Sequence, residues 1–235
     1  MSQGSLISFD GTDSSGKATQ ASALTERLRA LGHQAGKFMT PDYETDIGKR
    51  LKQLFQGTAG SWDDLTWQEQ MKLLADNRAQ HRQEVLDILE AGGIVVYDRY
   101  VPSSIAHMAV DALSPEEIDE GREEIARRVE EYEYKNNGMP HGSLSVFLDV
   151  PPHVSNKLLE TRKREQNESA EATDDVALQT RIYNEYLWLT SRDPAHYVRI
   201  KCLENGRLFK PEVISGLVWE AVTARIPRLS ASARL

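Results

Sequence analysis

Residues 5–20 read Ser5-Leu-Ile-Ser-Phe-Asp-Gly-Thr-Asp-Ser-Ser-Gly-Lys-Ala-Thr-Gln20 and combine a strand, a glycine loop and the start of a helix in that order. The apolar run breaks at Gly11, and Gly16 and Lys17 come directly before a helical pattern over residues 19–31. This order is the context that a G-x-x-x-x-G-K-[ST] phosphate-binding loop requires. The alternative is an ordinary glycine turn between a strand and a helix, but the flanking pattern favours the phosphate loop.

The residue types of this loop fit phosphate chemistry. Gly11 and Gly16 allow the backbone to curl until successive N–H groups point at phosphate oxygens. The helix that follows adds the positive end of its dipole, and Lys17 adds a mobile positive charge. Ala18 departs from the motif, because the Ser or Thr expected there would bind Mg²⁺ through its hydroxyl.

The chain has 235 residues, a formal net charge of −8 and a single cysteine, Cys202. This length is enough for one α/β domain with a sizeable core. The negative charge argues against a general nucleic-acid-binding surface, and the single cysteine excludes an internal disulfide and fits a reducing cytosol. The sequence shows no signal-peptide pattern and no apolar stretch of membrane-spanning length. We therefore expect a cytoplasmic protein that binds neither nucleic acids nor membranes.

Short apolar runs typical of buried parallel strands alternate with helical patterns. The strand candidates are Leu6–Phe9, a weaker Gln34–Met39, Ile94–Tyr97, Leu144–Val150 and Tyr197–Ile200. The helix candidates are Thr19–Leu31, Ile47–Gln56, Trp67–Glu90, Pro115–Tyr134, Val154–Arg164, Ala177–Leu189 and Pro211–Ala224. This alternation predicts an α/β fold in which helices cover both faces of a parallel sheet and ligands bind beyond the carboxyl ends of the strands.

A second polar group, Asp98 and Arg99, follows the strand at Ile94–Tyr97. An Asp–Arg pair at the carboxyl end of a core strand is costly to bury unless it has partners. The planar guanidinium of Arg99 matches phosphate, and Asp98 is placed to hold it or to join the water shell of Mg²⁺. The alternative is an internal ion pair that only closes the strand end.

Two further segments are candidates for a ligand wall. Arg78 lies among apolar neighbours on the helical stretch Trp67–Glu90, where it can reach a ligand base or simply be a surface arginine. The segment from Thr40 to Lys49, which contains Tyr43, is a turn that leads into a helix. Residues 160–175 carry a basic cluster followed by small and acidic residues, a pattern that fits either a mobile segment or a solvated connection between helices.

Taken in order, the motifs resemble those of thymidylate kinases. The motifs are G-x-D-x-x-G-K-x-T-Q from Gly11, P-x-Y-E-x-x-I-G-K from Pro41, L-L-x-x-N-R from Leu73, D-R-Y-x-x-S from Asp98 and F-L-D-V-P-P from Phe147. The resemblance runs from about residue 5 to about residue 220. It implies a P-loop kinase fold, a three-layer α/β/α sandwich with a mostly parallel five-stranded sheet and a mobile lid at about 160–175. We expect one domain over residues 1–226 and a disordered tail at 227–235.

The resemblance also implies an activity, which is the transfer of the γ-phosphate of ATP to dTMP with Mg²⁺, giving dTDP and ADP. It implies a homodimer. The residues implied to bind ATP are Gly11, Thr12, Asp13, Ser14, Ser15, Gly16, Lys17, Ala18 and Thr19. Those implied to bind dTMP are Asp13, Tyr43, Leu74, Arg78, Asp98, Arg99, Ser103, Ser104 and His107.

The implied catalytic residues are Asp13, Lys17 and Arg99 together with the lid arginines Arg162 and Arg164. The lid is expected to supply an arginine because position 14 is Ser, which leaves the phosphate loop without one. Asp13 and Asp98 are implied to hold the metal, largely through phosphates and water.

Three positions and a segment of the lid depart from the family pattern and keep two alternatives open. Leu74 stands where relatives usually have a Phe stacked on thymine, and His107 replaces the aromatic residue that helps to exclude a 2′-hydroxyl. These two positions favour a deoxynucleoside monophosphate kinase of altered base specificity. Ala18, and a lid that shows Ala170-Glu-Ala-Thr173 where relatives often have a D-x-x-E pattern, favour a nucleotide-binding protein with little catalysis.

Overall fold

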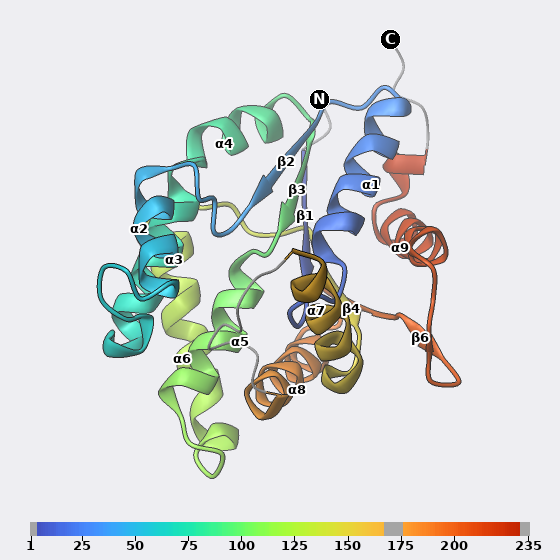
Figure 1. The fold of residues 1–235 in the computed structure, drawn as a ribbon. Coiled ribbons are helices and arrows are strands. Elements are labelled where there is room, and N and C mark those ends of the chain that lie inside the picture. Colours follow the sequence, from blue (N-terminus) through green and yellow to red (C-terminus); the bar gives the residue numbers. More distant parts are fainter. Residues whose placement is uncertain (1–3, 167–175, 231–235) are drawn as a thin grey trace.

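The computed structural model describes residues 4–166 and 176–230, with the backbone alone for residues 162–166. Its central sheet has five parallel strands in the order β2-β3-β1-β4-β5 (Figure 1). The strands are β1 Ser5–Asp10, β2 Ala35–Met39, β3 Ile94–Asp98, β4 Leu144–Asp149 and β5 Tyr197–Lys201. All five predicted strands are confirmed. Because every pairing is parallel, the carboxyl ends of β1 and β3 lie side by side at one end of the sheet.

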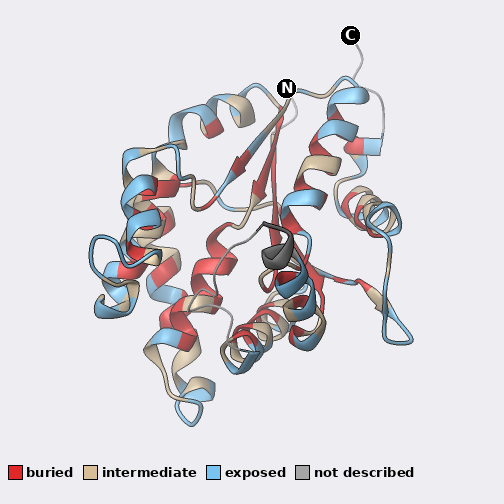
Figure 2. Cartoon of the chain, viewed as in Figure 1, coloured by how far each residue is buried: buried red, intermediate tan, exposed pale blue. Residues whose placement is uncertain are grey.

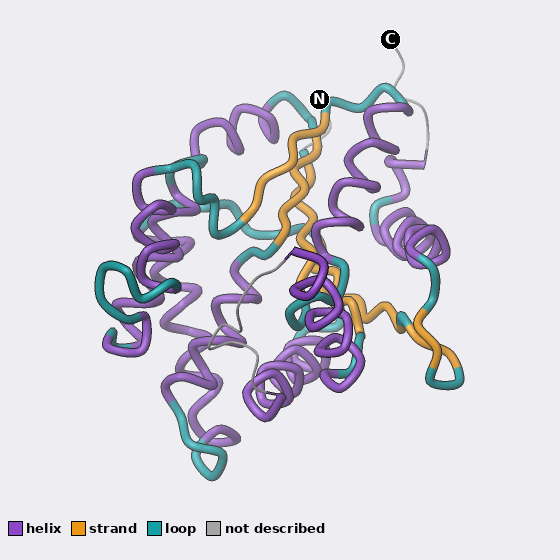
Figure 3. The backbone as a smooth tube through the Cα atoms, in the orientation of Figure 1, coloured by secondary structure: helices purple, strands orange, loops and turns teal. Residues whose placement is uncertain are grey.

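Helices cover the sheet on both sides (Figure 3). They are α1 Lys17–Ala30, α2 Asp46–Phe55, α3 Trp67–Ala79, α4 Arg82–Glu90, α5 Val101–Ala112, α6 Ile118–Glu130, α7 Pro152–Gln166, α8 Val176–Arg192 and α9 Pro211–Arg225. Shorter elements are the 3₁₀ turns η1 Trp62–Asp64 and η4 Pro227–Ser230, the π-helix η2 Glu131–Asn136, and the hairpin of β6 Leu203–Glu204 and β7 Arg207–Leu208. Among the described residues, no helix combines the length and the apolarity that crossing a membrane requires.

The two faces of the sheet build two hydrophobic cores because successive side chains of a strand point in opposite directions. Leu6 and Phe147 belong to the core that packs under α3, α5, α6 and α8. Ile7 and Leu148, one residue further along the same strands, belong to the core under α1 and α9. The buried residues accordingly line the strands and the inner sides of the helices (Figure 2). This arrangement is the predicted three-layer α/β/α sandwich.

The predicted helix over 67–90 is wrong as a single element, because it divides into α3 and α4. The division falls at His81, whose Nε2 lies 2.8 Å from Asp42 Oδ2 and whose ring packs on Phe38 with centroids 5.6 Å apart. His81 is the N-cap residue of α4, and these two contacts hold it against the turn before α2 and against β2.

The sequence patterns did not predict helix α5, although it carries Ser103, Ser104 and His107. Its sequence signal is Pro102 in the first turn, a position where the missing N–H costs nothing. Placement directly after β3 brings its N-terminal end to the same sheet edge as the glycine loop.

The predicted disordered tail at 227–235 is wrong for its first four residues. Pro227–Ser230 forms η4, in which the side chain of Leu229 is fully buried in the core under α1 and α9. Arg228 Nη2 also donates a hydrogen bond to Ser5 Oγ at 2.8 Å. Residues 231–235 lie outside the described part of the chain.

Candidate active site

The glycine loop after β1 has the backbone geometry of an anion cradle. Gly11 and Gly16 adopt positive φ values of 146° and 92°, and Ser14 adopts a φ of 58°. A Cβ on Gly11 would lie 2.9 Å from Ser15 Oγ, so a larger residue would distort the loop. Gly16 caps α1 without a side-chain hydrogen bond, which leaves the N–H groups of the first turn available to an anion.

Lys17 lies inside this loop and is almost fully buried. Its ammonium donates a 2.6 Å hydrogen bond to the carbonyl oxygen of Thr12. Burial, reinforced by the nearby charge of Arg99, lowers the pKa of Lys17 to about 7. A bound polyphosphate would oppose both effects and restore the full positive charge.

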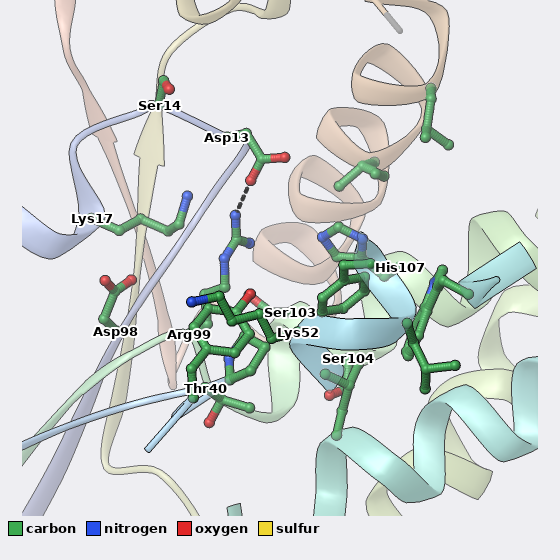
Figure 4. A pocket seen from close by; sticks show the side chains of 18 of the residues that line it. Asp13, Ser14, Lys17, Thr40, Lys52, Asp98, Arg99, Ser103, Ser104 and His107 are labelled. Atoms are coloured by element: carbon green, nitrogen blue, oxygen red, sulfur yellow. Dashed lines mark hydrogen bonds and ion pairs between the residues drawn. The ribbon is translucent and has the colours of Figure 1, made fainter. Parts of the chain in front are cut away.

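Asp13 links the loop to two other elements. Its carboxylate forms an ion pair with Arg99, drawn in Figure 4, and accepts a 3.1 Å hydrogen bond from Gln179 Nε2 on α8. The Asp13 backbone N–H donates to Gln179 Oε1 at 3.2 Å, so the Gln179 amide binds both the backbone and the carboxylate of Asp13. Burial favours the neutral acid, but the charges of Arg99 and Lys17 outweigh it and lower the pKa of Asp13.

Arg99 occupies a strained backbone position at the end of β3. Its φ is 64°, in the left-handed region that residues other than glycine rarely adopt. The Arg99 N–H donates to the carbonyl oxygen of Phe9 at 2.9 Å, and Nη1 donates to that of Gly11 at 3.2 Å. Burial disfavours the guanidinium charge, but Asp13 outweighs this effect and raises the pKa of Arg99. Arg99 therefore stays charged and points at the phosphate loop.

A buried network that the sequence did not reveal supports Arg99 from behind. Asp10 accepts a 2.7 Å hydrogen bond from Ser103 Oγ, which lies 2.9 Å from the hydroxyl of Tyr186 on α8. Arg99 Nη1 lies 3.5 Å from that same hydroxyl. Asp10 is 1% exposed, at the last position of β1. An acidic residue that ends an apolar strand, directly before the glycine loop, is the signal that could have identified it.

The site opens into one cavity of about 1050 Å³. All nine residues implied to bind dTMP line it: Asp13, Tyr43, Leu74, Arg78, Asp98, Arg99, Ser103, Ser104 and His107. Six of the nine implied ATP-binding residues also line it: Asp13, Ser14, Gly16, Lys17, Ala18 and Thr19. Gly11, Thr12 and Ser15 lie behind the wall. The hydroxyl of Thr12 points to Ser155 Oγ, 3.3 Å away, rather than into the cavity.

The turn before α2 forms one side of the cavity because α3 holds it in place. Asn77, fully buried on α3, accepts a 2.8 Å hydrogen bond from the Asp42 N–H and donates to Thr45 Oγ1 at 2.7 Å. The next residue, Arg78, faces the cavity and donates to Ser104 Oγ at 3.2 Å. Asn77 therefore holds the turn in place, and Arg78 lines the cavity.

Lys52 and Gln179 are candidate functional residues that the sequence-based reading missed. Lys52 lines the same cavity as Arg99, from α2. The amphipathic pattern of α2, which buries Leu51 and Leu54, is the signal that could have placed Lys52 on the adjoining face. For Gln179 no sequence signal was available, since its contact with Asp13 spans 166 residues of chain.

His107 lies on α5 at the wall that Asp13, Arg99 and Lys17 share. Burial, and then the charge of Arg99, lowers the pKa of His107 to about 4. The ring is therefore neutral near neutral pH and presents a hydrogen-bonding edge rather than a charge. Leu74 contributes an aliphatic surface to the same cavity.

The donor set fits Mg²⁺ that is bound mainly through phosphates. Asp13 and Asp98 offer hard carboxylate oxygens to the cavity that Lys17 enters (Figure 4). The described residues contain no group of three or more metal-ligating side chains. Ala18 adds no hydroxyl. Phosphate oxygens and water would therefore supply most of the ligands.

The two predicted lid arginines lie in the C-terminal part of α7. Arg162 and Arg164 belong to α7, but their side chains lie outside the described part of the chain, as does segment 167–175 of the predicted lid.

Comparison with known proteins gives a consistent result. The family model described as thymidylate kinase matches residues 9–205. The thymidylate kinase of Bifidobacterium longum is 30% identical over 97% of this chain and 99% of that protein. That of Synechococcus sp. is 26% identical over 96% and 98%. A solved thymidylate kinase from Candida albicans superposes with a TM-score of 0.68 at 23% identity, covering 95% of this chain and 93% of that one, which supports the fold.

The family model thus spans the glycine loop, the Asp98–Arg99 pair and most of the cavity wall, and a relative at 30% identity aligns almost from end to end. The chain belongs to the thymidylate kinase family.

Proposed function

We propose that this protein transfers the γ-phosphoryl group of ATP to dTMP, giving ADP and dTDP, and that the cavity described above holds both nucleotides. The observation that carries the proposal is the convergence of Lys17, Arg99 and the α1 N-terminus on one cavity that also extends to Arg78. Two anionic substrates repel each other, so a site that joins them must concentrate positive charge between them.

The donor half of the cavity is assigned to ATP. The first-turn N–H groups of α1 and the Lys17 ammonium would bind the β- and γ-phosphates. Mg²⁺, held by phosphates, water and the carboxylates of Asp13 and Asp98, would neutralise the charge of the transferring group. The low pKa of Lys17 in the free protein means that phosphate binding itself charges this residue.

The acceptor half of the cavity is assigned to dTMP. Arg99 would grip the phosphate of dTMP through its planar fork, with Lys52 adding a second positive charge from α2. Arg78 and Ser104 would bind the polar edge of the base, and Tyr43, Leu74 and His107 would enclose the base and sugar. Asp13 lies between the two halves, where it would orient the sugar and the metal.

A lid arginine would complete the charge neutralisation when both substrates are bound, and Arg162 and Arg164 are our candidates. An arginine that reaches the transition state of phosphoryl transfer contributes a factor on the order of a thousand or more in rate. We expect Arg162→Ala or Arg164→Ala to lower kcat with little change in substrate affinity, and unchanged kcat in both variants would remove the lid arginines from the mechanism.

One observation favours a second candidate, a kinase of broader base choice. Leu74 is an aliphatic wall, and it forgoes the aromatic stacking contribution of about 1 kcal/mol that a Phe would give. Comparable turnover of dUMP or dCMP would support this candidate, and strict preference for dTMP would remove it.

The test is ADP release in a coupled assay with ATP and Mg²⁺, offering dTMP, dUMP, dCMP, dGMP and AMP one at a time. Selective turnover of dTMP is the expected result. Nucleotide binding without any turnover across the panel would instead indicate a binding protein with little catalysis.

We further propose that the enzyme is cytoplasmic, works as a homodimer and has small nucleotides as its ligands. The net charge of −8 supports the absence of nucleic-acid binding. Light scattering on the purified protein would measure the mass of the assembly directly.

A further inference from the structure

A fully buried ion pair lies directly behind the base end of the cavity. Arg78 Nη1 contacts Glu133 Oε1, and the two side chains are 1% and 0% exposed. Arg78 Nη2 donates to Ser104 Oγ at 3.2 Å. The guanidinium is therefore held from two sides by residues of two other elements, η2 and α5.

This pair is difficult to explain by stability alone. Removing two charges from water costs several kcal/mol per ion, and apolar residues of similar size would pack at least as well. The arginine does have a reason to be charged if it binds a ligand. A pyrimidine base is neutral, however, so the ligand cannot supply the counter-charge. Glu133 supplies it from within the protein. Burial opposes the charge of Arg78, but Glu133 outweighs this effect and raises the pKa of Arg78.

The backbone around Glu133 is built to deliver this carboxylate. Glu133 lies in the π-helix Glu131–Asn136, and single π turns inside helical segments occur frequently at functional sites. Its neighbours are anchored to α3 by one side chain. Asp76 Oδ1 accepts hydrogen bonds from the Tyr132 hydroxyl at 3.2 Å and from Asn137 Nδ2 at 3.1 Å. Asp76 lies two residues before Arg78 on α3, so the arginine and the anchor of its counter-ion move together.

Arg78 lines the cavity and keeps N–H groups that its two protein partners do not use. Each Nη of a guanidinium carries two N–H groups. Glu133 engages one nitrogen and Ser104 the other, which leaves a second N–H on each of them. Within the described residues, Arg78 Nε and Glu133 Oε2 have no hydrogen-bond partner, so the pair is not closed upon itself.

We propose that Glu133 is the positioning residue of Arg78: it fixes the guanidinium so that its remaining N–H groups face a carbonyl oxygen on the acceptor base. This inference rests on the proposed function, in which Arg78 binds that base. An amino group at the same place on the base would present a donor to a donor. Glu133 therefore contributes to the selection of bases with a carbonyl oxygen over bases with an amino group, without touching either.

The test compares Glu133→Gln with the unchanged enzyme, measuring KM for dTMP, kcat, and the ratio of kcat/KM for dTMP over dCMP. Loss of a charge-assisted hydrogen bond at a buried site should raise KM for dTMP roughly tenfold or more. It should lower the dTMP/dCMP ratio and leave kcat at saturating dTMP within about twofold. Glu130→Gln is the matched control, because Glu130 lies nearby in the chain but pairs with Arg192 on α8, outside the cavity. This control should change none of the three values.

A double-mutant cycle separates positioning from a merely structural role. In an Arg78→Met background, Glu133→Leu should raise KM for dTMP no further, because Glu133 acts only through Arg78. Full additivity of the two changes would overturn the proposal. If Glu133→Gln fails to fold, Glu133→Asp replaces it. This variant keeps the charge but withdraws it from Arg78, and an unchanged KM would again overturn the proposal.

The same variants distinguish this inference from the proposed function. If Arg78→Met raises KM for dTMP and Glu133→Gln does not, the role of Glu133 is wrong and the acceptor site stands. If Arg78→Met itself leaves KM for dTMP unchanged, the assignment of the acceptor site fails.

Discussion

The guanidinium of Arg99 and the carboxylate of Asp13 form an ion pair that joins the end of β3 to the phosphate loop after β1. In the free protein, the cation assigned to the acceptor phosphate is therefore held by the acid assigned to orient the sugar and the metal. Binding of dTMP would share or replace this contact. The ion pair keeps Arg99 pointed at the loop. Substitutions of Arg99 and of Asp13 should therefore have different effects on the kinetics.

Arg99→Ala should damage dTMP affinity and rate together. The variant loses one or two charge-assisted hydrogen bonds to phosphate, worth about 1.5–3 kcal/mol each, so kcat/KM should fall roughly a hundredfold or more. Steady-state kinetics with varied dTMP gives the value. Arg127→Ala, which removes an exposed arginine paired with Glu124 on α6, is the control. If dTMP binding survives Arg99→Ala unchanged, the assignment of Arg99 is wrong.

Asp13→Asn should separate affinity from rate. The amide frees Arg99 from its carboxylate partner, so we expect KM for dTMP to stay level or to fall. The charge that orients the metal and sugar is lost, so kcat should drop roughly tenfold or more. A rise in KM with unchanged kcat would show that Asp13 serves binding only.

ATP binding should take up a proton through Lys17. The free protein has a Lys17 pKa of about 7, below the ordinary value of 10.5, so at about pH 8 most molecules carry a neutral amine there. Bound phosphates favour the ammonium and raise this pKa, and the proton comes from the solvent. Titration calorimetry in buffers of different ionisation enthalpy measures the uptake. Lys17→Met should abolish it, and equal uptake by that variant would contradict the assignment.

Ala18→Ser should lower the Mg²⁺ concentration that the enzyme requires for activity. Position 18 lines the cavity with an exposed side chain, so a hydroxyl fits without displacing neighbours. One additional oxygen ligand worth on the order of 1 kcal/mol should lower the Mg²⁺ concentration for half-maximal activity roughly threefold to tenfold. An Mg²⁺ dependence identical to that of the unchanged protein would show that this position does not face the metal.

Leu229→Ala should destabilise the fold although Leu229 lies within the predicted tail. The side chain is fully buried, and its removal leaves a cavity in the core under α1 and α9. The free energy of unfolding should fall by about 2–4 kcal/mol in urea titrations. Truncation after residue 230 tests the remaining tail separately, and an unchanged stability of Leu229→Ala would contradict the packing seen for η4.

The sequence-based prediction was right for features that depend on neighbouring residues and wrong for features that depend on residues far apart in the chain. The five strands and the glycine loop were predictable because apolar runs, glycines and a lysine act within a few neighbouring residues. Helix α5 was missed because its buried residues are not confined to one stripe: Ile105, Ala106, Met108 and Val110 are all buried where the helix packs between its neighbours. The division of the helix at His81 was missed, and the contact that holds His81 there is with Asp42, 39 residues away.

The sequence by itself determined the class of fold, the glycine loop and three cations that line the cavity, Lys17, Arg78 and Arg99. Those features depend on local patterns of hydrophobicity, on glycine backbone freedom and on residue types that match phosphate. Only the tertiary structure decided how the cations are held: Arg99 by Asp13, Asp13 by Gln179, and Arg78 by Glu133. Each of these contacts joins side chains 55 or more residues apart, and a buried charge takes whichever partner the packing of the helices brings within reach.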